Sequence, residues 1–86
     1  MEKKTLYVFT AEQVYDCEVI DLILVTFWNK NDAVDYMKKF VEDIKSSIKN
    51  RGWQVEEDCP TYYQTFEPFH YVENHVECIV HETEIR

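Results

Sequence analysis

The sequence predicts an α+β domain of β-β-α-β-β order, in which one helix packs on one face of a mostly antiparallel sheet. Two observations lead to this prediction. Residues 31–51 repeat apolar side chains at helical spacing, and the flanking segments are rich in β-branched and aromatic residues or alternate between apolar and polar ones. The 86 residues are read as a single domain, 1–86, because this length holds one hydrophobic core.

The first two strands are predicted to form a hairpin. Residues 6–9 open the first strand, and residues 19–28 form the second, which is rich in β-branched and aromatic residues. Residues 15–18 supply the turn between them. A competing interpretation makes Thr10 to Gln13 a capping box that starts a short helix. The hairpin is the preferred interpretation.

The helix is predicted from about residue 31 to residue 51. Asn29 or Asn31 can cap its start, and Gly52 suits the left-handed residue that follows many helix ends. A row of lysines lies on the same segment, which is typical of the solvent-facing side of an amphipathic helix. The predicted buried stripe consists of Val34, Met37, Val41, Ile44 and Ile48, widened by Ala33 and Phe40.

Two further strands are expected after the helix, one at residues 53–56 and one at residues 74–85. Between them, Pro60 and Pro68 bracket an aromatic segment, residues 61–67. Because proline lacks an N–H group for the strand ladder, this segment is predicted to be an edge strand or a loop.

Three segments resemble small uncharacterised proteins from bacteria and their phages. They are residues 7–16 (YVFTAEQVYD), residues 52–57 (GWQVEE) and the Asn74-His75 pair before an acidic end. The resemblance covers nearly the whole chain. It implies the same order of elements and carries no activity over to this protein.

The charges are strongly segregated along the chain. The net charge is −8, yet Lys and Arg are absent from residues 5–28 and again from residues 52–85. Carboxylates repel a phosphate backbone, so direct binding to nucleic acid is not expected. A positively charged protein partner is expected instead, and imitation of a nucleic acid by spaced carboxylates is a sharper variant.

Both faces of the second strand are apolar, although a single helix can cover only one face of the sheet. Leu22 and Leu24 point one way along residues 19–28. An uncovered apolar face usually marks a partner surface, unless residues 62–69 fold back over it. Self-association, with a C2 homodimer as the commonest form, is therefore predicted through a sheet face or edge. The residues assigned to it are Ile23, Val25 and Phe27.

Aromatic and acidic residues are interleaved after the helix. Rings can contact cations, and carboxylates can pair with Lys or Arg of a basic partner. If these residues have a structural role only, the aromatic rings belong to the core and the acidic side chains form a solvated rim around it. The residues assigned to partner binding are Trp53, Glu56, Glu57, Asp58, Tyr62, Tyr63, Glu67 and Glu73.

A metal site is not expected. His75 and His81 are six residues apart on one strand, about 20 Å at 3.3 Å per residue, so they cannot share an ion. Cys78 is predicted to face away from His75, which leaves Cys59 and His70 without convergent ligands.

Catalytic residues and cofactors are not expected either. The two serines, Ser46 and Ser47, lie within the helix, and the single glycine, Gly52, cannot form a phosphate-binding loop.

The sequence thus predicts a non-enzymatic acidic protein-interaction module. It is expected to self-associate and to engage a basic partner. The alternative is a small-ligand or metal-binding domain that uses Tyr62, Tyr63, His70 and His75. Three cysteines without a CxxC pair, no signal-peptide core and no membrane-length apolar run favour the cytoplasm.

Overall fold

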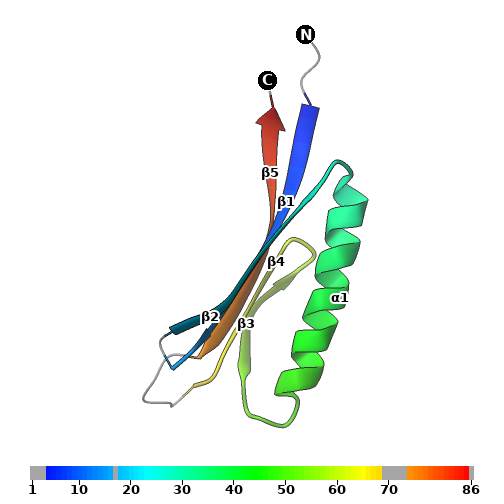
Figure 1. The fold of residues 1–86 in the computed structure, drawn as a ribbon. Coiled ribbons are helices and arrows are strands. Elements are labelled where there is room, and N and C mark those ends of the chain that lie inside the picture. Colours follow the sequence, from blue (N-terminus) through cyan, green and yellow to red (C-terminus); the bar gives the residue numbers. More distant parts are fainter. Residues whose placement is uncertain (1–3, 17, 69–73, 86) are drawn as a thin grey trace.

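The computed structural model describes residues 4–16, 18–68 and 74–85, and it confirms the α+β class. One helix lies against a five-stranded antiparallel sheet (Figure 1). The elements in chain order are β1 (Lys4–Tyr15), β2 (Glu18–Phe27), α1 (Lys30–Ile48), β3 (Gln54–Cys59), β4 (Tyr62–Phe66) and β5 (His75–Ile85).

The strands lie in the order β2-β1-β5-β4-β3, so β2 and β3 form the two edges of the sheet. The prediction that residues 61–67 form an edge strand or a loop is wrong in its position, because β4 lies inside the sheet between β5 and β3. Pro60 and Pro68 fall just outside β4. Neither proline therefore removes a hydrogen bond from the ladder.

The β1–β2 hairpin is confirmed, and the short helix starting at Thr10 is wrong. Thr10 to Gln13 continue β1 and pair with β2 on one side and β5 on the other. The turn is closed by Asp16, whose φ of 53° lies in the left-handed region that Asp tolerates. The Asp16 N–H also donates to Asn74 Oδ1 at 2.8 Å, which fastens the turn to the start of β5.

Helix α1 begins after Asn29, whose side-chain Oδ1 accepts a hydrogen bond from the Asn31 N–H at 2.8 Å. This confirms one of the two predicted caps. The helix ends at Ile48, three residues earlier than predicted, because Asn50 already adopts a left-handed φ of 66°. Gly52 follows with φ 78°, as the sequence indicates for this position.

The core lies between α1 and one face of the sheet. On the helix side it contains most of the predicted stripe. Val34 and Phe40 are half-buried, and the buried members are Ala33, Met37, Val41, Ile44 and Ile48. On the sheet side its buried members come from β1, β4 and β5: Phe9, Ala11, Tyr63, Val76 and Cys78. The helix covers this face alone. We call it the covered face and the opposite side of the sheet the open face (Figure 1).

The molecule is elongated, with extents of 52 × 22 × 17 Å. Its radius of gyration is 14.5 Å, whereas a compact chain of this length has about 12 Å. The excess arises because β1 and β5 extend past the end of α1, where Lys4 of β1 pairs with Ile85 of β5 (Figure 1). Such a shape leaves more sheet exposed to solvent than one helix can cover.

The register identifies which apolar residues of β2 lie under the helix. Phe27 pairs with Tyr7, and Ile23 pairs with Ala11; Ile23 and Phe27 pack against the core. Val25 pairs with Phe9 and shares that side. The three residues assigned to self-association are therefore on the covered face. Leu22 and Leu24 are the most exposed of the apolar residues that β2 leaves uncovered, which also include Val19 and Ile20. Alternation alone could not tell which set the helix would cover.

Candidate functional site

The open face carries a row of acidic and amide side chains that crosses four strands. Glu12 of β1 pairs with Glu77 of β5. Glu77 in turn pairs with Gln64 of β4, which pairs with Glu57 of β3. Neighbouring strands lie about 4.8 Å apart, so successive side chains in this row are close neighbours. We call Glu12, Glu77, Gln64 and Glu57 the acidic row.

Hydrogen bonds hold parts of this region in place. The Tyr62 hydroxyl donates to Glu77 Oε2 at 2.9 Å, and Gln64 Oε1 lies 3.3 Å from the same hydroxyl. The hydrogen bond to Glu77 raises the pKa of Tyr62, because losing the proton would set two negative charges side by side. His75 Nε2 lies 3.8 Å from Glu12 Oε1. One end of the row therefore has a histidine partner and its centre a tyrosine donor.

A shallow hollow of about 340 Å³ lies beside the acidic row, lined by Glu56, Glu57, Tyr62 and Gln64. Glu56 is the extra residue of a β-bulge between Val55 and Glu57. Bulges often re-aim side chains near the edge of a sheet. Here two carboxylates and a phenol ring border one depression, which suits a positively charged side chain that also has an apolar stem.

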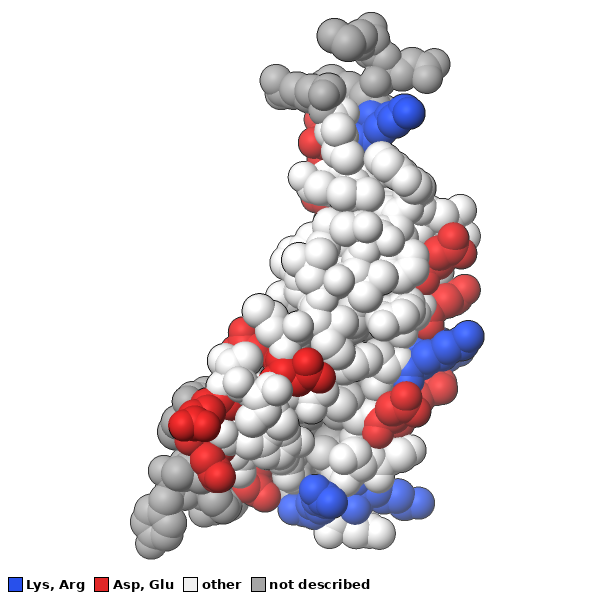
Figure 2. Space-filling view, viewed as in Figure 1, with Lys and Arg blue, Asp and Glu red and all other residues white. Residues whose placement is uncertain are grey.

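The charge pattern of the surface follows the elements. Lys and Arg lie on and just after the helix and near the termini, whereas the strand side at the lower left of Figure 2 gathers acidic side chains without Lys or Arg among them. The strands after Lys4 contain no Lys or Arg, so no cation within them neutralises the acidic row.

On its β2 side the open face is apolar. Leu22 and Leu24 are 70% and 66% exposed, and both belong to the edge strand. Leu24 pairs with Thr10 and Leu22 with Glu12, so the apolar edge adjoins the acidic row directly. The open face thus combines an apolar edge with an acidic centre.

The structure divides the predicted partner surface. Glu57 and Tyr62 lie together on the open face, beside Glu56 at the bulge. Asp58 and Tyr63 point to the covered face instead, since they pair with each other on the side where Tyr63 is buried.

The remaining predicted members serve local structure or lie elsewhere. Trp53 packs against the core and lies 5.9 Å from the Tyr15 ring, measured between centroids. Glu67 Oε1 accepts a hydrogen bond from Asn74 Nδ2 at 2.7 Å. Glu73 lies outside the described residues.

Glu12, Gln64 and Glu77 were not predicted from the sequence to belong to this surface. Alternation along residues 74–85 does place Glu77 opposite the buried Val76 and Cys78, which is a usable signal. No local pattern shows that Glu12 and Glu77 meet, because 65 residues separate them and only the pairing of β1 with β5 joins them.

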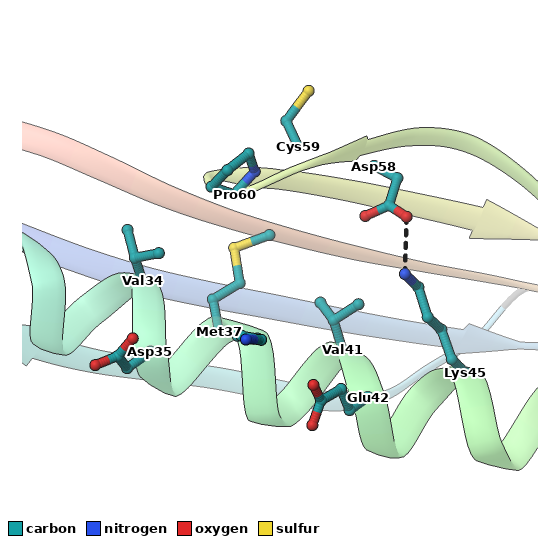
Figure 3. A pocket seen from close by; sticks show the side chains of 10 residues that line it. Val34, Asp35, Met37, Val41, Glu42, Lys45, Asp58, Cys59 and Pro60 are labelled. Carbon is teal, nitrogen blue, oxygen red and sulfur yellow. Dashed lines mark hydrogen bonds and ion pairs between the residues drawn. The ribbon is translucent and has the colours of Figure 1, made fainter.

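A second candidate site is a groove of about 570 Å³ between α1 and the turn from β3 to β4 (Figure 3). Val34, Met37 and Val41 point from the helix toward the strands, and Pro60 lies across from them. Lys45 Nζ lies 2.7 Å from Asp58 Oδ2 and closes one end. This hydrogen bond raises the pKa of Lys45. The Cys59 sulfur points away from the groove (Figure 3).

The Tyr63 hydroxyl, fully buried near this groove, has no hydrogen-bond partner among the described residues. The neighbouring Thr65 hydroxyl donates instead to the Gln54 carbonyl oxygen at 2.7 Å. Burial raises the pKa of Tyr63. We expect Tyr63→Phe to leave the free energy of unfolding unchanged or to raise it by about 1 kcal/mol, because an unsatisfied buried polar group is removed. Urea unfolding of both proteins measures this, and a loss of similar size would indicate a missed partner for the hydroxyl.

The histidines and cysteines of the described segments do not converge. No group of three His, Cys, Asp or Glu side chains among these residues could hold a metal ion. Cys59 is exposed and Cys78 is buried, and both are free thiols. Of the residues assigned to the alternative ligand site, Tyr62 and His75 share the open face, Tyr63 lies on the covered face, and His70 lies outside the described residues.

Comparisons with protein-family models, with curated proteins and with solved structures give no match. The structure shows the β-β-α-β-β order that the resemblance implied, followed by one further strand. Within the described residues, no helix has an apolar stretch long enough to cross a membrane.

Proposed function

We propose that this protein is a non-enzymatic interaction module that self-associates and that binds a positively charged protein segment on its open face. The observation that carries the proposal is the acidic row, in which Glu12, Glu77 and Glu57 lie at matched positions on three strands with no Lys or Arg between them. Three carboxylates on a rigid sheet present a fixed spacing to a partner. Binding therefore does not have to offset the conformational entropy lost when a flexible loop becomes ordered.

The residues around the acidic row favour a protein segment, rather than a small ion, as the binding partner. Tyr62 adds a ring beside Glu57 and Gln64, where a Lys or Arg stem can pack while its charged end reaches a carboxylate. The apolar edge with Leu22 and Leu24 continues the surface beyond the charges. A mixture of apolar and charged area is typical of protein interfaces. The free thiols of Cys59 and Cys78 agree with a reducing compartment such as the cytoplasm.

The test reverses the charge of the acidic row. We expect the triple variant Glu12→Lys, Glu57→Lys, Glu77→Lys to weaken binding of Lys- and Arg-rich peptides about 10- to 100-fold at low salt, because opposite charges become like charges at the contact. The salt dependence of the remaining binding should be nearly flat. Fluorescence anisotropy of labelled peptides at several salt concentrations measures both quantities.

A matched control separates the acidic row from net charge. The variant Asp35→Lys, Glu42→Lys, Asp43→Lys changes the net charge by the same amount, but all three residues are exposed on α1, away from the open face and from β2. We expect it to lose less than about threefold in affinity, since distant exposed charges are screened by salt. Equal losses in the two triple variants would reject the acidic row as the binding surface.

A sharper form of the proposal is that the acidic row imitates the phosphates of a nucleic acid. In that form the partner is a basic nucleic-acid-binding protein, and duplex DNA competes with this protein for it. Competition measured with such a partner, and its loss in the acidic-row variant, would support imitation. Simultaneous binding of DNA and this protein would reject it.

A further inference from the structure

The two edges of the sheet differ in how well they are protected against pairing with another strand. Edge strand β3 is six residues long, contains a bulge at Glu56 and carries three consecutive carboxylates. Charges, bulges and short length are the usual devices that block edge pairing. Edge strand β2 is ten residues long. Its two charges, Glu18 and Asp21, and a register shift opposite Gln13 and Val14 are confined to its start, and its segment from Leu22 to Phe27 carries no charge, no bulge and no proline. β2 therefore offers an open row of backbone donors and acceptors.

The charge of the side chains along β2 also changes from one end of the strand to the other. Asp16, Glu18 and Asp21 lie at or near its start. At its other end, Lys30 begins α1, and Lys4 Nζ lies 6.0 Å from the ring centroid of Trp28. One end of the edge is therefore acidic, the middle neutral and the other end basic.

We propose that two copies of this chain pair through β2, antiparallel and around a two-fold axis, so that two five-stranded sheets join into one continuous sheet of ten strands. This gives a specific route to the self-association on which the proposed function rests. Antiparallel pairing places the acidic start of each β2 beside the basic end of its partner, and the contact occurs twice by symmetry. Parallel pairing would set the two acidic starts side by side.

The same arrangement covers the exposed leucines of the open face. With the two-fold axis near Leu24, the side chains of Leu22 and Leu24 from both copies become cross-strand neighbours on one face. Asp21 then lies opposite uncharged residues of the other copy, because the segment from Leu22 to Phe27 is neutral. Two chains of net charge −8 repel each other, and this orientation offsets part of the repulsion because it sets charges of opposite sign side by side.

The acidic row stays free in such a dimer. Its carboxylates Glu12, Glu77 and Glu57 belong to β1, β5 and β3, and none of them lies on the β2 edge that pairs with the other copy. A perpendicular two-fold axis also puts both helices on the same side of the joined sheet and both acidic rows on the other. The dimer would therefore present two binding surfaces to a partner.

The experiment blocks the β2 edge with a single charge. We expect Leu24→Lys to raise the dimer dissociation constant at least tenfold, since two lysines meet near the axis and an edge lysine disfavours strand addition. The substitution makes the net charge less negative, so a general loss of repulsion would favour the dimer instead. The matched control is Val55→Lys on the other edge strand, where the side chain is 48% exposed, and it should leave dimerisation unchanged. Sedimentation equilibrium measures the constants.

Hydrogen exchange distinguishes strand pairing from other dimers. In the full-length protein, about half of the β2 amides should become more slowly exchanging as the protein concentration rises, and Leu24→Lys should abolish this change. A dimer without concentration-dependent protection in β2, or one that Leu24→Lys leaves intact, overturns the edge pairing while self-association itself stands. A strictly monomeric protein overturns both. Peptide binding by the acidic row is measured in a separate experiment, so its result tests the binding surface independently of the edge pairing.

Discussion

Replacing Phe9 with alanine is expected to lower the free energy of unfolding by about 3–5 kcal/mol. Phe9 is fully buried on the covered face, and its ring lies edge-on to Tyr36 and Phe40 at centroid distances of 5.2 and 5.4 Å. The substitution leaves a cavity between β1 and α1 and removes both ring contacts. Since domains are stable by only about 5–15 kcal/mol, the variant should be close to unfolding at room temperature.

Urea unfolding followed by circular dichroism measures this loss, with Val55→Ala as its matched control. Val55 lies on an edge strand and is about half exposed, so its truncation should change stability by about 0.5 kcal/mol or less. Phe9→Leu, which keeps most of the apolar volume, should fall between the two. A Phe9→Ala loss as small as that of Val55→Ala would mean that α1 does not pack on β1 as described.

Stability is expected to fall above pH 9 because of Cys78. Burial raises the pKa of this thiol from 9.0 to about 12, so the folded state keeps its proton where the unfolded state has lost it. The contribution is complete below pH 9 and disappears as the pH rises from 9 toward 12. One pKa unit corresponds to about 1.4 kcal/mol, so we expect the free energy of unfolding to fall by about that amount between pH 8 and pH 10.

The Cys78→Ala variant isolates this effect. It should be less stable at every pH because of the small cavity, but its free energy of unfolding should change much less between pH 8 and pH 10. Urea unfolding under reducing conditions at both pH values measures the difference. Tyr62, Tyr63 and Lys45 also have raised pKa values, so they add losses in the same direction at higher pH. If the free energy of unfolding changed equally with pH in the two proteins, the Cys78 thiol would not be buried in the core.

The helix, its buried stripe, the hairpin and the α+β class were determined by the sequence alone. They depend on local periodicity: Met37, Val41 and Ile44 recur at helical spacing, and β2 is dense in β-branched residues. The same alternation also placed Val76 and Cys78 on one face of the last strand and His75 on the other, as observed. Where neighbours in the chain decide a conformation, the pattern is sufficient.

Tertiary structure alone decided the strand order, the covered face and the membership of the acidic row. Pro60 and Pro68 suggested an edge for β4, yet pairing placed β4 inside the sheet because both prolines fall beyond its ends. Ile23 and Leu24 are neighbours of similar hydrophobicity, and only the docking of α1 on one face of the sheet left Ile23 partly buried and Leu24 exposed. Glu12 and Glu77 meet through a pairing between distant segments. Such choices depend on the free energy of long-range contacts, which no local pattern encodes.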